Sequence, residues 1–123
     1  MKEYNDLSEK IIGRAIEVHK NLGPGLLESI YESALCIEFD LKNISYKRQF
    51  EIPILYKKYE IGKHRLDLIV DNKIILELKA VDNLNPIFEA QLLSYLKISG
   101  FKLGLLINFN QILLKDGIKR IIL

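Results

Sequence analysis

The chain has 123 residues, 49% hydrophobic and 28% charged, a balance that suits one globular domain over residues 1–123 and excludes a disordered or low-complexity protein. The net charge of +2 is too small to indicate a nucleic-acid binder by itself, and a single cysteine excludes an intramolecular disulfide or a cysteine-ligated zinc site. No apolar run approaches the length of a membrane span and the N-terminus is charged, so we expect a cytoplasmic protein without a signal peptide.

Two helices are predicted at the start of the chain. Apolar residues recur at helical spacing up to Leu22, and we expect Asn5 or Asp6 to cap this helix. A glycine–proline–glycine segment ends it, because proline lacks an amide hydrogen and glycine accepts left-handed turns. A second helix is predicted from about Leu26 to Lys42, with Cys36 beside the core. Its expected inward stripe is Leu27, Ile30, Tyr31, Ala34, Leu35, Ile37 and Leu41.

Three strands follow, because the hydrophobic period changes to two from Ile44 to Ala80. The first strand covers about Ser45 to Tyr56, and Pro53 indicates an edge position or a bulge. The second runs from about Tyr59 to Val70 and the third from Lys73 to Ala80. Short turns connect them, so we expect an antiparallel meander.

The last third of the chain predicts one helix and two more strands. Asn85-Pro86 is a helix start, with a capping side chain before a proline, and the helix should end at Gly100. The apolar run from Phe101 to Phe109 suits a strand buried on both faces, and Ile118 to Leu123 forms a final short strand. The order α-α-β-β-β-α-β-β predicts a mixed sheet flanked by helices, in the α/β class.

The third strand carries two charged residues on one face. Alternation places Glu77 and Lys79 on the same side of the strand. On a half-exposed strand they would form an ion pair contributing about 0–1 kcal/mol. The neighbouring residues are apolar, however, so the strand should lie inside the sheet, where charges need strong partners. Asp67 of the preceding strand is the candidate partner.

The length of one turn decides whether Asp67 can meet Glu77. A two-residue turn at Asp71-Asn72 places Asp67 opposite Leu76, on the wrong face. A three-residue turn that includes Lys73 places Asp67 opposite Glu77. Adjacent carboxylates repel each other unless a cation lies between them. A metal site therefore requires the longer turn or a bulge.

Three motifs in order resemble those of a known nuclease superfamily. Asp67 followed by Glu77-Leu78-Lys79 is similar to the signature of the PD-(D/E)XK nucleases, with Leu66 in place of the proline. Gly25-Leu26-Leu27-Glu28-Ser29-Ile30-Tyr31 fits G-x-x-E-x-x-Y, the pattern that names a small family within this superfamily. Gln91-Leu92-Leu93-Ser94-Tyr95 resembles the Q-x-x-x-Y motif of the RecB-like branch. The resemblance covers nearly the whole chain and implies a restriction-endonuclease-like core.

The resemblance also implies roles for individual residues. Asp67 and Glu77 would be direct ligands for Mg²⁺, with Mn²⁺ as a possible substitute, and Glu28 a third carboxylate bound directly or through water. Lys79 would orient the attacking water or stabilise charge on the phosphate.

Other polar and aromatic residues leave two interpretations open. Gln91 and Tyr95 lie four residues apart on one helix face, where they could contact a phosphate or base, or form helix surface and partial core. Tyr31 could hold the Glu28 carboxylate, although its spacing favours the core. His64 is expected to be exposed and without a role.

The function implied is a Mg²⁺-dependent nuclease that hydrolyses phosphodiester bonds, with the choice between DNA and RNA left open. The alternative is a nuclease-fold module that binds nucleic acid or a protein partner without cutting, because fold alone does not settle function. The complete set Glu28, Asp67, Glu77 and Lys79 favours the enzyme. A minimal core of this size could work as a homodimer or with a partner, and no membrane is involved.

Overall fold

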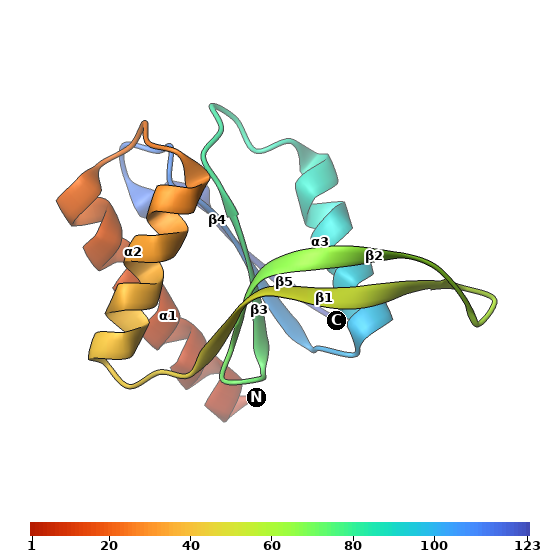
Figure 1. The fold of residues 1–123 in the computed structure, drawn as a ribbon. Coiled ribbons are helices and arrows are strands. Elements are labelled where there is room, and N and C mark those ends of the chain that lie inside the picture. The colour runs from red at the N-terminus through yellow and green to blue at the C-terminus, as the bar shows by residue number, and fades with distance from the viewer.

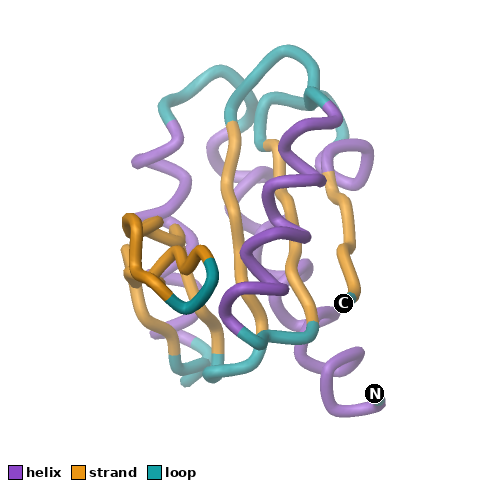
Figure 2. The backbone as a smooth tube through the Cα atoms, turned by 90° about the vertical axis from the view of Figure 1, so that its right-hand side faces the viewer, coloured by secondary structure: helices purple, strands orange, loops and turns teal.

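The computed structural model describes residues 1–123 and shows a five-stranded sheet with helices on both faces (Figures 1 and 2). The elements are α1 (Lys2–Leu22), α2 (Glu28–Leu41), β1 (Tyr46–Tyr56), β2 (Tyr59–Val70), β3 (Ile74–Lys79), α3 (Pro86–Ser99), β4 (Leu103–Asn108), the short 3₁₀ helix η1 (Leu114–Gly117) and β5 (Ile118–Ile122). Helices α1 and α2 cover one face of the sheet, and α3 covers the other. The predicted α/β class and element order are confirmed. None of the helices has the length and apolar composition needed to cross a membrane.

The strands lie side by side in chain order, β1-β2-β3-β4-β5. The first three form the predicted antiparallel meander, β3 and β4 are parallel, and β4 and β5 are antiparallel. Helix α3 is the crossover that parallel neighbours need. All six residues of β4 are buried, as its apolar run predicts. The edge strand β1 contains Pro53 and has a bulge directly after Ile54.

Helix α1 begins earlier than the sequence indicates. It starts at Lys2, and the expected caps Asn5 and Asp6 lie inside its first two turns. No side chain caps the helix; the amide of Asn5 instead donates to the carbonyl of Met1. The added turn is stabilised because Tyr4 packs against the core.

The predicted inward stripe of α2 is only partly correct. Leu27, Ile30, Ile37 and Leu41 are all more than 40% exposed. The residues that α2 buries are Tyr31, Glu32, Leu35, Cys36 and Phe39. The helix has apolar residues on both sides, and only the side with Tyr31, Leu35 and Phe39 faces the sheet and α1. Periodicity alone could not choose between the two sides.

Helix α3 has the predicted ends. The Asn85 side chain accepts a hydrogen bond from the amide of Ile87, and Gly100 ends the helix with a φ of 83°. The helix packs closely on β4 because Gly104 has no side chain: a Cβ there would lie 2.8 Å from Leu92. This close approach brings the inner face of α3 down onto the sheet.

The sheet separates two apolar cores. The α1/α2 core consists of Leu7, Ile11, Ala15, Val18, Tyr31, Leu35, Cys36, Phe39, Leu68, Val70, Ile74, Leu76, Leu78, Leu103, Leu105, Ile107, Phe109 and Leu114. The α3 core consists of Ile52, Leu66, Ile69, Ile75, Leu92, Leu96 and Leu106. Strand β3 contributes to both, as its alternation predicts, with Ile75 on the α3 side and its even-numbered residues on the other.

The β1–β2 hairpin changes the face it presents half-way along. Near the sheet, Tyr46 and Leu68 pack on the α1/α2 core, whereas farther out Ile52 and Leu66 pack in the α3 core. The change occurs at Gln49, whose positive φ of 50° turns the strand. The outer half of the hairpin therefore curls across the α3 side of the sheet (Figure 1).

Candidate active site

The turn between β2 and β3 has three residues. Val70 pairs with Ile74, so Asp71–Lys73 form the turn, and the same register places Asp67 opposite Glu77. Regular pairing between the two strands ends one residue earlier along β2. The strands therefore separate where the two carboxylates face each other.

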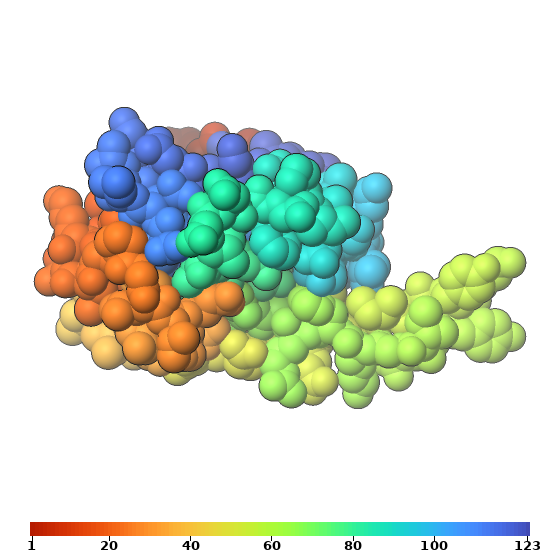
Figure 3. Space-filling model, turned by 90° about the horizontal axis from the view of Figure 1, so that it is seen from above, coloured from red at the N-terminus to blue at the C-terminus, as the bar shows by residue number.

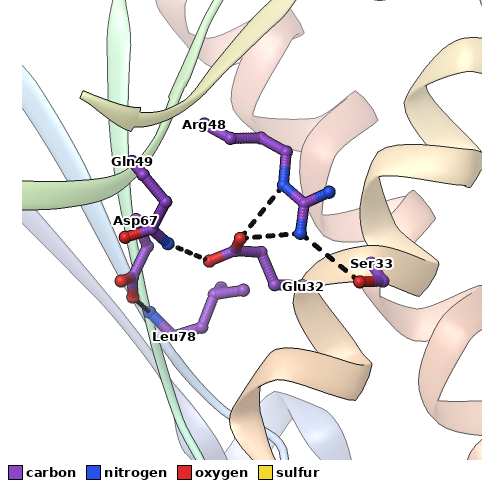
Figure 4. A network of polar contacts seen from close by, with 6 residues as sticks. All are labelled: Glu32, Ser33, Arg48, Gln49, Asp67 and Leu78. Carbon is purple, nitrogen blue, oxygen red and sulfur yellow. Dashed lines mark hydrogen bonds and ion pairs between the residues drawn. The ribbon is translucent and has the colours of Figure 1, made fainter.

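Carboxylate oxygens replace the backbone ladder at this point. The amide of Leu78 donates to Asp67 Oδ2 at 2.8 Å, and the amide of Asp67 approaches Glu77 Oε2 at 3.4 Å (Figure 4). These bonds fix both acidic side chains at the opening between the strands. The charged residues thus satisfy the sheet backbone while pointing oxygens into the gap.

The gap opens into a small pocket of about 110 Å³. It is lined by Glu28, His64, Arg65, Asp67, Glu77, Lys79, Phe88, Gln91, Leu92, Tyr95 and Leu106. All six residues singled out from the sequence are among them, brought from α2, β2, β3 and α3. A larger hollow of about 690 Å³ lies between α1 and the turn after α2, but its lining mixes charges of both signs.

Lys79 is held at the end of β3 by contacts on both sides. Its Nζ lies 4.4 Å from the centre of the Phe88 ring, a cation–π contact. Its carbonyl accepts from the amide of Phe109 at 2.9 Å. The neighbouring Asn108 is fully buried and exchanges hydrogen bonds with the backbone of Val81, at 2.8 and 3.0 Å. Asn108 thereby fixes the chain just beyond Lys79; a lone amide in an apolar strand was the available sequence signal.

Glu28 is the first residue of α2, and Tyr31 fixes the loop before it. The Tyr31 hydroxyl donates to the carbonyl of Gly23 at 2.6 Å and accepts from the amide of Leu26 at 3.0 Å. Its ring is fully buried and stacks on Phe109, with 4.5 Å between ring centres. Tyr31 is therefore a core residue that shapes the approach to Glu28 and makes no recorded bond to the Glu28 carboxylate.

A second acidic residue of α2, Glu32, ties the helix to β1 (Figure 4). It is only 7% exposed, and its Oε2 accepts two hydrogen bonds from Arg48, at 2.9 and 3.1 Å. The Gln49 amide donates to its Oε1 at 2.8 Å. This network joins α2, one turn after Glu28, to the position where the hairpin changes face. Sequence patterns gave no signal for it, because its partners are distant in the chain.

The expectation that His64 is exposed and without a role is wrong in its first part. The His64 ring stacks on Tyr95, with 3.8 Å between ring centres. Its Nε2 lies 3.3 Å from Glu77 Oε1. Burial lowers the pKa of His64, opposed by the charge of Asp67, so the ring is neutral at neutral pH. Strand alternation alone misplaced His64 because the outer hairpin curls toward α3.

Comparison with known proteins agrees with this geometry. The family model described as the PD-(D/E)XK nuclease superfamily matches residues 5–121. The chain belongs to the PD-(D/E)XK nuclease superfamily. No curated protein and no solved structure matches it. Nucleases of this superfamily typically use divalent metals, so membership indicates a nuclease-like function and interaction with nucleic acid.

Electrostatics in the PD-(D/E)XK pocket favour a positive charge between the acidic residues. Burial raises the pKa of Glu77 to about 9, with the adjacent Asp67 carboxylate adding to the effect and the Lys79 ammonium opposing it. Burial also raises the pKa of Glu28, which Lys79 opposes. A proton or a metal cation would relieve the same repulsion.

The donor set fits the divalent metal that members of the superfamily use. No three acidic, imidazole or thiol groups are arranged as a ready-made metal cage. Magnesium does not need one, because it keeps several waters and binds through one or two carboxylates. Asp67 and Glu77 supply such a pair, and Glu28 lines the same pocket. These hard oxygen donors suit Mg²⁺ or Mn²⁺ better than zinc.

Proposed function

We propose that this protein is a divalent-metal-dependent nuclease that hydrolyses phosphodiester bonds in nucleic acid. One observation carries the proposal: Asp67 and Glu77 meet where β2 and β3 separate, in the pocket that Lys79 also lines. Placing two carboxylates together in a buried site destabilises the metal-free protein at neutral pH. A function that uses a cation accounts for this arrangement, whereas a purely structural role does not.

Each group of the pocket has a proposed part in the reaction. Asp67 and Glu77 hold Mg²⁺, or Mn²⁺ in its place, and Glu28 contributes directly or through water. When bound, such an ion supplies Lewis acidity toward a phosphoryl oxygen and makes water more acidic. Lys79 donates hydrogen bonds to the attacking water or to a phosphate oxygen as negative charge develops there. The water oxygen forms a bond to phosphorus, the ester P–O bond breaks, and the departing oxygen takes a proton.

The remaining assignments belong to the same proposal. Gln91 and Tyr95 line the pocket from α3 and contact a phosphate or base, with His64 stacked on Tyr95 to hold its ring. The G-x-x-E-x-x-Y and Q-x-x-x-Y patterns support a place in the G-x-x-E-x-x-Y family of the RecB-like branch. We also propose that residues 1–123 form one domain that acts in the cytoplasm, as a homodimer or with a partner protein.

A cleavage assay tests the proposal directly. Purified protein is incubated with single-stranded and duplex DNA and RNA in the presence of Mg²⁺, Mn²⁺ or EDTA. We expect cleavage with either ion, none with EDTA, and none with the Asp67→Asn protein, which keeps its fold. Binding of nucleic acid without metal-dependent cleavage of any substrate would instead establish the non-cutting module.

A further inference from the structure

The outer part of the β1–β2 hairpin, residues 53–63 and here called the arm, projects away from the body of the protein (Figures 1 and 3). Its large apolar and aromatic side chains are exposed: Leu55 by 53%, Tyr56 by 59%, Tyr59 by 76% and Ile61 by 66%. A two-stranded ribbon gains little stability from side chains that remain in water. A cluster of this kind is typical of an interaction surface.

The exposed tyrosines lie on the face of the hairpin that forms the pocket wall. Three cross-strand pairs share this face, because residues two apart along a strand point the same way. From the pocket outward they are Ile52–His64, Ile54–Gly62 and Tyr56–Tyr59. His64 lines the pocket, and four residues at about 3.3 Å each place the tyrosine pair about 13 Å farther along β1. Gly62 leaves the strip between them low, since nothing lies within 4 Å of its Cβ position.

The arm is also positively charged. It holds Lys57, Lys58 and Lys63 against Glu60, a net charge of +2 from three lysines and one glutamate. Lys57 and Lys58 form the tip with φ values of 48° and 71°. Asn-Gly would adopt this turn at lower cost, so the two lysines have no advantage for folding. The Lys57 ammonium lies 5.5 Å from the centre of the Tyr56 ring.

Charge and aromatic surface together select the partner. A second copy meeting this arm in a symmetric interface would place the tip lysines against their own counterparts, which is unfavourable. A polynucleotide has the opposite charge, and its unpaired bases can stack on aromatic rings. We propose that the arm binds the single-stranded part of the substrate where it leaves the pocket. Tyr56 and Tyr59 stack on bases, and Lys57 and Lys58 pair with phosphates. This inference rests on the proposed nuclease function.

Binding measurements with two variants test the arm. Fluorescence anisotropy in EDTA follows labelled single-stranded and duplex oligonucleotides, since metal-dependent cleavage cannot then proceed. Tyr56→Ser/Tyr59→Ser should weaken single-strand binding roughly five- to a hundred-fold for each stacked base lost, and duplex binding less. Lys57→Asn/Lys58→Gly keeps the turn and should lower the slope of log K against log salt by about 2.

A matched control removes two lysines elsewhere. Lys115→Asn/Lys119→Asn changes the charge by the same amount near β5, at the opposite edge of the sheet, and should leave the salt slope close to that of the wild type. Wild type that cleaves with Mg²⁺ while the arm variants bind single strands unchanged overturns the arm alone. Wild type that neither binds nor cleaves overturns the nuclease function and the arm with it. A wild-type dimer that the tyrosine variant converts to a monomer, seen by light scattering, would assign the arm to self-association instead.

Discussion

On the α1/α2 face of the sheet, eighteen buried side chains form the core, whereas the α3 face buries seven beside the polar pocket. The larger core holds two helices against the sheet and contains no charged side chain. The α3 face instead lies beside a buried glutamate whose neutral form is favoured. The comparison indicates that one face supplies most of the stability and the other face accepts destabilising groups for chemistry. The following five predictions test this division.

The largest expected effect comes from matched aromatic residues, one on each face. Phe39→Ala removes a fully buried ring from the α1/α2 core and should lower the free energy of unfolding by about 3–5 kcal/mol. Phe88→Ala removes a partly exposed ring beside Lys79 and should cost less than half as much. Urea unfolding of both proteins measures the difference. Equal losses would mean that the two faces contribute alike.

Lys79→Ala should affect activity without affecting the fold. Removing a group that stabilises charge in the transition state should lower metal-dependent cleavage by about a hundred- to a thousand-fold. Calorimetric titration with Mg²⁺ should still show binding, since the carboxylates remain. Lys73→Ala is the control: it removes the same charge at the other end of β3, where Lys73 pairs with Glu3 and Asp71. A Lys79→Ala protein that cleaves at the wild-type rate would remove Lys79 from the mechanism.

The pH dependence of stability reports the cost of the buried pair. The pKa of Glu77 is about 9 in the folded protein and 4.5 normally, so the folded state binds the extra proton between these values. The metal-free protein should therefore lose stability as pH rises from about 7 to about 9, by at most about 1.4 kcal/mol per pH unit. His64 is neutral in both states over this range. Thermal unfolding across the range measures the slope, and Glu77→Gln should flatten it. An equally steep slope in that variant would place the titrating group elsewhere.

Arg48→Met probes the network that anchors α2. It leaves the Glu32 carboxylate with one partner, Gln49, and should lower the free energy of unfolding by about 1–2 kcal/mol, because Arg48 is partly exposed. Glu32→Met/Arg48→Met removes both charges and should recover most of this loss. Chemical unfolding of the three proteins completes a double-variant cycle. If the double variant is no better than the single one, the two side chains are not energetically coupled.

The smallest expected effect is that of Asp67→Asn on the metal-free fold. The asparagine oxygen can still accept from the amide of Leu78, and the repulsion with Glu77 disappears. The melting temperature should stay level or rise slightly, while Mg²⁺ affinity falls. Thermal melts with and without Mg²⁺ measure both changes. A large drop in the melting temperature would show that Asp67 is a structural ion-pair partner.

The sequence by itself determined the element order, the antiparallel meander and the ends of α3, because these depend on local periodicity, proline and capping side chains. It also singled out the six motif residues that line one pocket in the structure, although their chemical roles remain proposals. It left the β2–β3 turn open between two lengths, and Val70 pairing with Ile74 decided it.

Only the tertiary structure decided which side of α2 faces the sheet and where His64 points. Helix α2 is apolar on both sides, so local periodicity was equally satisfied by either packing. His64 reaches Tyr95 because the hairpin changes face at Gln49, a non-glycine residue with a positive φ that no turn motif announces. The Glu32–Arg48 bond likewise joins residues that only the packing of α2 against β1 brings together. Such contacts depend on the relative placement of whole elements, which short-range sequence patterns do not encode.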